Sequence, residues 1–312
     1  MPLFSVTKDK LESVSQTNFP TEKALQTLVE GNLDAVFKCR LIATEFSTGA
    51  QHSGRIDTLA LSEDNNPVII EYKKVESSNL ITQSLFYLSW IYDHRGDFEI
   101  AAQKALGSKV QVDWSDVRVI CIAPNYQRYD LHAVRALGGN LELWTYRLYS
   151  NGVLYFEPVQ QGLEGAGNDS LSGPGKDPVM VAAGKKAAVT RATGSYTFDQ
   201  HIEAKPVAMR DMALAVNDYV ISLHSQIEVA PKKLYVAYRI SQNFLCMEVQ
   251  KKQVLLYLKL DPKKVAGPKG LSRDVTNIGH FGTGDLEITL STLGNLEEAK
   301  PFIELAYQNV GG

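Results

Sequence analysis

The chain has 312 residues, which is more than one small hydrophobic core usually organises, and this length predicts two domains. The net charge of −3 excludes the chain-wide basic excess that marks many nucleic-acid-binding proteins. The three cysteines form no CxxC pair, which excludes a zinc ribbon and suits a reducing cytosol. We see no signal peptide and no membrane-spanning apolar run, and we therefore expect a cytoplasmic protein.

The first half of the chain is predicted to alternate between helices and strands. A short strand and a loop over residues 1–19 precede a helix from Glu22 to about Phe37, for which Thr21 is a suitable N-cap. The later elements, in chain order, are strands at 39–46, 56–61 and 68–72, helices at 79–92 and 97–106, a strand at 117–123, a helix at 126–137, and strands at 141–149 and 153–156. Together they form a first predicted domain, residues 1–160.

The most informative stretch lies between residues 54 and 73, where two predicted strands are joined by a polar turn. Glu71 and Lys73 are two residues apart on the second strand, so they share one face. An acid and a lysine on an otherwise apolar strand cost stability unless they pair or bind something. Asp57 and Glu71 could hold a hard divalent cation, and a partly buried salt bridge on an edge strand is the alternative.

Polar residues on two neighbouring helices favour the cation site over the salt bridge. Gln83 and Tyr87 are four residues apart and lie on one face of the helix after the second strand. The upstream helix offers Glu22 and Glu30 as additional acids. Polar groups that converge from three consecutive elements are typical of a functional site.

These residues form a pattern that resembles a known family. Asp57, then Glu71-Tyr72-Lys73, then residues 83–87 (QSLFY) resemble the D…(D/E)xK…QxxxY signature of the PD-(D/E)XK nuclease superfamily. The likeness is to the NucS-like and RecB-like branch, in which the sequence GRID ends on the metal-binding Asp; an isoleucine stands before it in place of proline. The resemblance covers roughly residues 20–158. It implies an α/β restriction-endonuclease-like core with a mixed sheet flanked by helices.

The resemblance also implies a function and a metal site. It implies a metal-dependent nuclease that hydrolyses DNA phosphodiester bonds in repair, restriction or defence. Asp57 and Glu71, with the carbonyl of Tyr72, would bind Mg²⁺ or Mn²⁺. Lys73 would orient water or stabilise charge on the phosphate, because an amine with a reference pKa of ~10.4 is no base at neutral pH.

The remaining site residues are implied by their positions in the motif. Glu22 stands at the start of its helix like the helical acid of the family, with Glu30 as the alternative. Gln83 and Tyr87 would position the nucleic-acid backbone. Arg55 would grip a phosphate, and an ion pair with a nearby acid is an equal alternative for this residue.

Two other classes of function stay open. A nuclease fold can serve as a non-cleaving nucleic-acid-binding or assembly module, although the presence of Asp57, Glu71 and Lys73 together argues against a dead site. In a third class, the C-terminal domain binds a protein or small ligand and the N-terminal domain only assists. The sequence leaves open DNA versus RNA, endonuclease versus exonuclease cleavage, and whether the chain forms a homodimer.

The second half of the chain begins with a change of composition. Residues 161–195 form a predicted flexible linker, because Gly, Ala, Ser, Asp and Pro dominate there. Residues 196–312 form a predicted α+β domain with a mainly antiparallel sheet, built from helices at 207–223 and 297–308 and strands at 234–240, 244–250, 254–260 and 286–290. This domain resembles an uncharacterised α+β domain that is often appended to nuclease-like domains, and the resemblance implies no known chemistry.

Two features of this domain invite a functional interpretation. Residues 231–273 carry ten Lys or Arg, opposed only by Glu248 and Asp261. Such an excess can neutralise phosphates, and a solvated face is the alternative. His280 lies in a glycine-rich turn with no nucleophile at a motif spacing, which favours a local hydrogen bond over catalysis.

Limited proteolysis tests the predicted linker. We expect cleavage between Gly162 and Gly194 and release of two folded fragments, because exposed segments of small and polar residues are the preferred sites of nicking. Mass spectrometry of the fragments locates the cuts. Resistance across the whole stretch would contradict this interpretation.

Overall fold

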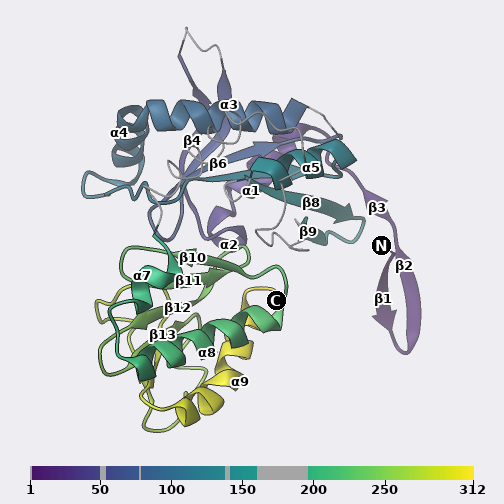
Figure 1. The fold of residues 1–312 in the computed structure, drawn as a ribbon. Helices are drawn as coiled ribbons and strands as arrows, with labels where there is room; N and C mark the ends of the chain where they lie inside the picture. Colours follow the sequence, from purple (N-terminus) through teal and green to yellow (C-terminus); the bar gives the residue numbers. More distant parts are fainter. Residues whose placement is uncertain (1, 50–53, 77–78, 138–140, 160–195) are drawn as a thin grey trace, which may run out of the picture. The chain divides into compact units, whose positions relative to one another are not determined.

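The computed structural model describes residues 2–49, 54–76, 79–137, 141–159 and 196–312. The chain divides into two compact units, Met1–Gln161 and Gly162–Gly312 (Figure 1). The predicted linker, residues 161–195, lies outside the described residues. Within the part that is described, no helix combines the length and apolar character that crossing a membrane requires.

The first unit is built on a seven-stranded mixed sheet. Its strands are β3 Gln16–Thr17, β4 Arg40–Ser47, β5 Arg55–Leu61, β6 Pro67–Tyr72, β7 Arg118–Ala123, β8 Leu141–Tyr149 and β9 Leu154–Pro158. The order is β3-β8-β7-β6-β5-β4, and β9 also pairs with β8. Strands β6, β7 and β8 run parallel, whereas the other pairs are antiparallel. The mixed sheet expected from the sequence is therefore confirmed.

Helices pack on both faces of this sheet. They are α1 Glu22–Glu30, α2 Leu33–Val36, α3 Asn79–Asp93, α4 Arg95–Leu106 and α5 Arg128–Leu137. Helices α3 and α4 form a core with the sheet face that includes Leu59 and Ile69. Helix α1 lies on the opposite face, because its Glu30 accepts a hydrogen bond from Thr58, whose side chain alternates with that of Leu59. The carboxylates of the predicted site therefore have helices nearby on either side.

The predicted helix from Glu22 to Phe37 is two helices in the structure. Its start is confirmed, since Thr21 Oγ1 accepts a hydrogen bond from the Ala24 N–H at 3.0 Å. Helix α1 ends before Gly31 and Asn32, and the Asn32 amide donates to the Leu28 carbonyl at 2.8 Å. Asparagine thus satisfies a carbonyl left open at the helix end, where its side chain competes with continuation of the helix.

The N-terminal residues form a hairpin where the sequence predicts one short strand. Strands β1 Leu3–Thr7 and β2 Lys10–Val14 pair antiparallel as a separate two-stranded sheet. Lys8 and Asp9 connect them with φ of 46° and 66°. Positive φ at both central residues matches the twist of paired strands, but this turn usually carries Asn-Gly or Asp-Gly. The turn therefore has no strong sequence signal.

The second unit is a six-stranded antiparallel sheet with helices. Its elements are α7 Phe198–Ile202, α8 Val207–Leu223, β10 Glu228–Pro231, β11 Val236–Arg239, β12 Asn243–Val249, β13 Val254–Leu258, β14 Ser272–Asp274, β15 Leu286–Leu290 and α9 Leu293–Asn309. The order is β10-β11-β12-β13-β15-β14. All neighbours are antiparallel, as expected from the closely spaced turns. Helices α8 and α9 pack their apolar faces on one side of this sheet (Figure 1).

The basic residues of 231–273 do not form one uniform surface. Arg239 and Arg273 are paired with Glu228 and Glu287, acids that lie outside the segment. Lys232 is buried. Most of the other lysines lie at opposite ends of the β12–β13 hairpin, either in its turn or after β13. The local charge excess in the sequence is therefore divided and partly neutralised in the fold.

The glycine-rich turn at 279–284 packs against the strands. Gly284 has a φ of +126°, and a Cβ there would lie 2.8 Å from the backbone of Leu258. Gly279 has open space around it and a φ outside the left-handed region. His280 stacks on the Tyr257 ring with centroids 4.5 Å apart, and its Nδ1 lies 2.8 Å from the Ile278 carbonyl oxygen. These are local contacts of the kind expected from the sequence.

A pair of glycine substitutions tests this packing. Gly284→Ala should lower the free energy of unfolding by about 1–3 kcal/mol, because it adds a Cβ where both φ and space favour glycine. Gly279→Ala serves as the matched control and should leave stability nearly unchanged. Urea unfolding of both variants measures the difference, and equal stabilities would contradict the prediction.

Candidate active site

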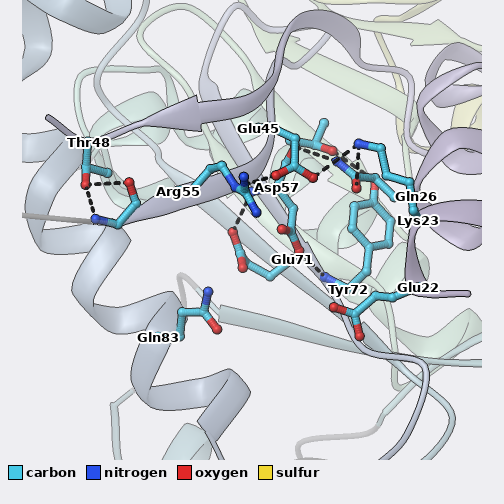
Figure 2. Close-up of polar contacts among 12 residues, drawn as sticks. Glu22, Lys23, Gln26, Glu45, Thr48, Arg55, Asp57, Glu71, Tyr72 and Gln83 are labelled. Carbon is cyan, nitrogen blue, oxygen red and sulfur yellow. Dashed lines mark hydrogen bonds and ion pairs between the residues drawn. The ribbon is translucent and has the colours of Figure 1, made fainter.

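Strands β5 and β6 exchange side-chain hydrogen bonds where Asp57 and Glu71 stand. Their backbone register ends at Thr58↔Ile70. Beyond it, the Asp57 N–H donates to Glu71 Oε1 at 3.0 Å, and the Tyr72 N–H donates to Asp57 Oδ2 at 3.1 Å (Figure 2). Each carboxylate therefore accepts a main-chain hydrogen bond from the other strand. This exchange fixes both acids at one end of the β5–β6 hairpin.

The two carboxyl groups resist ionisation in this position. The Glu71 side chain is fully buried. Burial, followed by the charge of Asp57, raises the pKa of Glu71 to about 9. Burial also raises the pKa of Asp57, although the Tyr72 N–H and Lys73 oppose the shift. Neighbouring acids that lose water and repel one another are stabilised when a positive charge joins them.

The vicinity of Glu71 fits a divalent cation. Its Oε2 is buried and, within the described residues, makes no hydrogen bond. An acceptor of this kind beside a second acid matches the oxygen ligands that Mg²⁺ and Mn²⁺ prefer. The Tyr72 hydroxyl lies 3.3 Å from Thr58 Oγ1 on the other face of the sheet, so only the main chain of Tyr72 can take part.

The protein supplies few side-chain ligands at this place. Over the described ranges, no group of three or more His, Cys, Asp or Glu side chains is placed to hold a metal ion. A cation bound by Asp57 and Glu71 would therefore take main-chain oxygen and water as its other ligands. Mg²⁺ commonly binds in this way, through one or two carboxylates and several waters.

Lys73 and Glu22 form an ion pair next to the two acids. Lys73 Nζ donates to Glu22 Oε1 at 3.1 Å, and the Lys74 N–H donates to Glu22 Oε2 at 3.0 Å. Burial alone would lower the pKa of Lys73, but Glu22, Asp57 and Glu71 outweigh it and raise the pKa. The ammonium group therefore stays charged at neutral pH.

The structure separates the two helical acids that the sequence leaves open. Glu22 contacts Lys73 directly. Glu30 instead accepts hydrogen bonds from Thr58 at 2.6 Å and Thr44 at 3.0 Å, and also from the Gln26 amide. Its carboxylate is thus held by neutral donors from strands β4 and β5. Of the two helical acids, Glu22 is therefore the one that contacts Lys73, and its role in the site stays a prediction.

Tyr87 supports the strand that carries Asp57. Its side chain is buried, and its hydroxyl donates to the Arg55 carbonyl at 2.8 Å and accepts from the Arg55 N–H at 3.1 Å. Gln83 donates to the same hydroxyl at 3.0 Å and projects from α3 on the side of Glu71 (Figure 2). A Cβ on Gly54 would approach Tyr87 to 2.9 Å, which explains glycine there. Substrate contact by Gln83 and Tyr87 stays a prediction.

The sequence patterns miss three residues near Asp57, namely Lys23, Gln26 and Glu45. Gln26 of α1 is buried and donates to the Asp57 carbonyl at 2.8 Å. Glu45 of β4 forms ion pairs with Lys23 and Arg55. The ion-pair alternative for Arg55 is thus realised, with Glu45 as the acid. No periodic signal identifies these residues, because their roles depend on the pairing of β4 with β5 and on the placement of α1.

A cavity of about 680 Å³ lies elsewhere in the first unit. Its lining includes Arg40, Asn65 of the β5–β6 turn, and residues 106–111 after α4. None of the predicted site residues lines this cavity, and Asp57 and Glu71 lie at the other end of the same hairpin. The candidate site is defined by its charge chemistry and not by cavity size.

Comparison with known sequences finds relatives without an assigned chemistry. Residues 198–310 match a family described as a domain of unknown function, DUF5655. A protein of Haemophilus influenzae described as uncharacterized is 27% identical over 313 residues, which cover 99% of this chain and 100% of that protein. This similarity extends across both units.

Comparison with solved structures finds two partial matches. The structure of an EndoMS–dsDNA2 complex matches 39% of this chain and 44% of that chain, with 18% identity and a TM-score of 0.30. A repair endonuclease from Pyrococcus abyssi matches 41% of this chain and 48% of that chain, with 16% identity and a TM-score of 0.23. The match thus spans less than half the length of either solved chain.

The raised pKa of Glu71 predicts how stability depends on pH. Between the ordinary value of 4.5 and about 9, the folded cation-free protein keeps a proton that the unfolded chain releases. Wild-type stability should therefore fall as pH rises through this window. Glu71→Gln removes the titration but keeps an acceptor for the Asp57 N–H. The free energy of unfolding of Glu71→Gln minus that of wild type should therefore rise between about pH 5 and pH 8. The rise should be at least ~1.4 kcal/mol, the equivalent of one pKa unit.

Urea unfolding in EDTA at the two pH values measures this difference. Asp57 titrates in both proteins, so the change in the difference between them reports mainly the titration of Glu71 and its coupling to Asp57. If the difference in free energy of unfolding between variant and wild type stays constant with pH, the assigned burial of the Glu71 carboxyl group is contradicted.

Proposed function

We propose that the first unit is a divalent-cation-dependent nuclease that hydrolyses phosphodiester bonds in DNA. The observation that carries the proposal is the pair of carboxylates, Asp57 and Glu71, with a lysine ammonium beside them. One buried oxygen of Glu71 has no hydrogen bond within the described residues. The choice of DNA rests on the resemblance of the motif to the NucS-like branch. Roles in DNA repair, restriction or defence belong to the same proposal.

Asp57, Glu71 and the Tyr72 carbonyl would hold Mg²⁺ or Mn²⁺. Such an ion, when bound, supplies positive charge for the scissile phosphate and for a water nucleophile. The chain's own contribution is to fix the two carboxylates in advance, through the hydrogen bonds from Asp57 and Tyr72. Donors and charges that are fixed before reaction need no reorganisation when charge develops.

Lys73 would stabilise negative charge on the phosphate. Its pKa is raised, so it acts as a cation and not as a proton acceptor. Glu22 holds the ammonium group in place from the first turn of α1. Arg55 lies on the same strand as Asp57 with an exposed side chain, which suits contact with a second phosphate.

A non-cleaving module that binds nucleic acid is the second candidate. The observation that favours it is the small ligand set, because Asp57 and Glu71 are the two carboxylates that the described residues bring together at the proposed cation position. A weak cation site would leave a fold that binds a nucleic-acid backbone without cutting it. Cation binding and cleavage therefore decide between the two candidates.

Glu71→Gln and Lys73→Ala test the nuclease proposal. Wild-type protein with Mg²⁺ or Mn²⁺ should cleave at least one member of a panel of single-stranded, duplex, flap and mismatched DNA. Both variants should lose at least about 10²-fold in rate, the scale found when one electrostatic stabiliser is removed from a preorganised site. Glu12→Gln and Lys104→Ala change exposed residues of the same types and should retain activity.

Calorimetry tests the cation site separately from activity. Binding of Mg²⁺ or Mn²⁺ requires ionised Glu71, so wild type should release close to one proton per ion at neutral pH. Glu71→Gln should bind more weakly and release fewer protons. Cleavage that persists in Glu71→Gln, or a wild type that binds neither ion, would move the protein into the non-cleaving class.

A further inference from the structure

Glu45 occupies an unusual backbone position next to Asp57. It lies on β4 between the register pairs Thr44↔Thr58 and Phe46↔Ile56, so it is the neighbour of Asp57 across the strand pair. Its φ is 54°, in the left-handed region. This conformation costs a non-glycine residue about 1 kcal/mol or more and persists only where surrounding contacts enforce it.

The Glu45 carboxylate bridges a helix and a strand. Oε1 is 3.1 Å from Lys23 Nζ of α1, and Oε2 pairs with Arg55 Nε of β5 (Figure 2). Burial would raise the pKa of Glu45, but Lys23 and Arg55 outweigh it and lower the pKa. The carboxylate is therefore charged at neutral pH and stays available to both cations.

This arrangement leaves the outer part of Arg55 open. Its side chain is 70% exposed, whereas its main-chain N–H and carbonyl both form hydrogen bonds with the Tyr87 hydroxyl. Glu45 pairs with the Nε atom, and among the described residues no hydrogen bond is found for the two terminal guanidinium nitrogens. Those two nitrogens form the fork that binds a phosphate bidentately.

Stability alone is a weak reason for the contact between Glu45 and Arg55. Arg55 is exposed and Glu45 only partly buried, and ion pairs at the surface contribute about 0–1 kcal/mol, which is no more than the backbone cost of Glu45. The presence of a strained residue whose contact adds little stability is better explained by the group that the residue holds in place. Here that group is a guanidinium two residues from Asp57 on the same strand.

We propose that Glu45 is a positioning residue that holds Arg55 by its Nε and directs the free end of the guanidinium to a phosphate of bound nucleic acid. The phosphate is a neighbour of the one that faces Asp57 and Glu71. The inference rests on the proposed function of this site, because it needs a nucleic-acid backbone there. It assigns Glu45 a role through Arg55 and no contact with the reacting atoms.

The variant Glu45→Asn separates the backbone from the carboxylate. Asparagine adopts left-handed φ more readily than glutamate, so the variant should fold with equal or greater stability. It removes the charge and shortens the side chain, which releases Arg55. If Glu45 has only a structural role, the variant should be at least as stable as wild type and bind substrate as tightly. If Glu45 positions Arg55, the variant should be stable but bind substrate more weakly.

The experiment is a double-mutant cycle on full-length protein with Glu45→Asn and Arg55→Gln. The substrate is a fluorescent DNA oligonucleotide, with affinity measured in Ca²⁺ and kcat and KM measured in Mg²⁺. Glu45→Asn should weaken affinity and raise KM by about tenfold, with kcat within about twofold, because uniform binding of the substrate is lost. In the Arg55→Gln background it should add no further loss.

Salt dependence and a control complete the test. Arg55→Gln should reduce the slope of log affinity against log salt by roughly 0.9 on duplex DNA, since one phosphate contact is lost. Asp34→Asn breaks the ion pair with Lys38 elsewhere in the unit and should change neither affinity nor KM.

Three results overturn the inference: Glu45→Asn binds DNA as tightly as wild type or more tightly, its effect persists undiminished in Arg55→Gln, or wild type binds no DNA. Its failure is distinguishable from failure of the proposed function. If wild type cleaves DNA and Glu45→Asn has the affinity and KM of wild type, only the positioning role is ruled out. Affinity that depends on Glu45 through Arg55, without cleavage in any cation, removes the catalytic proposal and leaves the positioning role in place.

Discussion

The site in the first unit depends on one exchange of hydrogen bonds, in which Asp57 and Glu71 each accept a main-chain N–H from the opposite strand. This exchange replaces ladder pairing at the end of the β5–β6 hairpin. It holds two acids together in a place where burial disfavours the charge of both. The energetic cost of bringing them together is therefore met by folding, before any ligand arrives.

The surrounding charges are arranged unevenly around this pair. Glu22 and Glu45 each have a cation within ion-pair distance, Lys73 for the first and Lys23 with Arg55 for the second. Among the described residues, neither Asp57 nor Glu71 takes part in an ion pair of that kind. The charges of Glu22 and Glu45 are thus balanced by cations of the protein. Asp57 and Glu71 would be stabilised by a further positive charge.

The supporting contacts explain how the site stays in place at a strand end. Helix α1 holds β5 through the hydrogen bond from Gln26 to the Asp57 carbonyl, and helix α3 holds it through Tyr87 and the Arg55 main chain. Helices on opposite faces therefore fix the same three-residue segment. The second unit has its own core between its sheet and helices, and its basic residues are divided by position and by pairing.

Local periodicity in the sequence determined much of this protein. Helical spacing placed Gln83 with Tyr87, Thr21 marked the start of α1, and close turns predicted the antiparallel sheet. Tertiary structure decided that Glu22 and not Glu30 meets Lys73, that Tyr87 binds a backbone, and that Glu45 lies beside Asp57. These outcomes depend on strand register, helix placement and one left-handed φ, which arise between segments distant in the chain and leave no periodic signal.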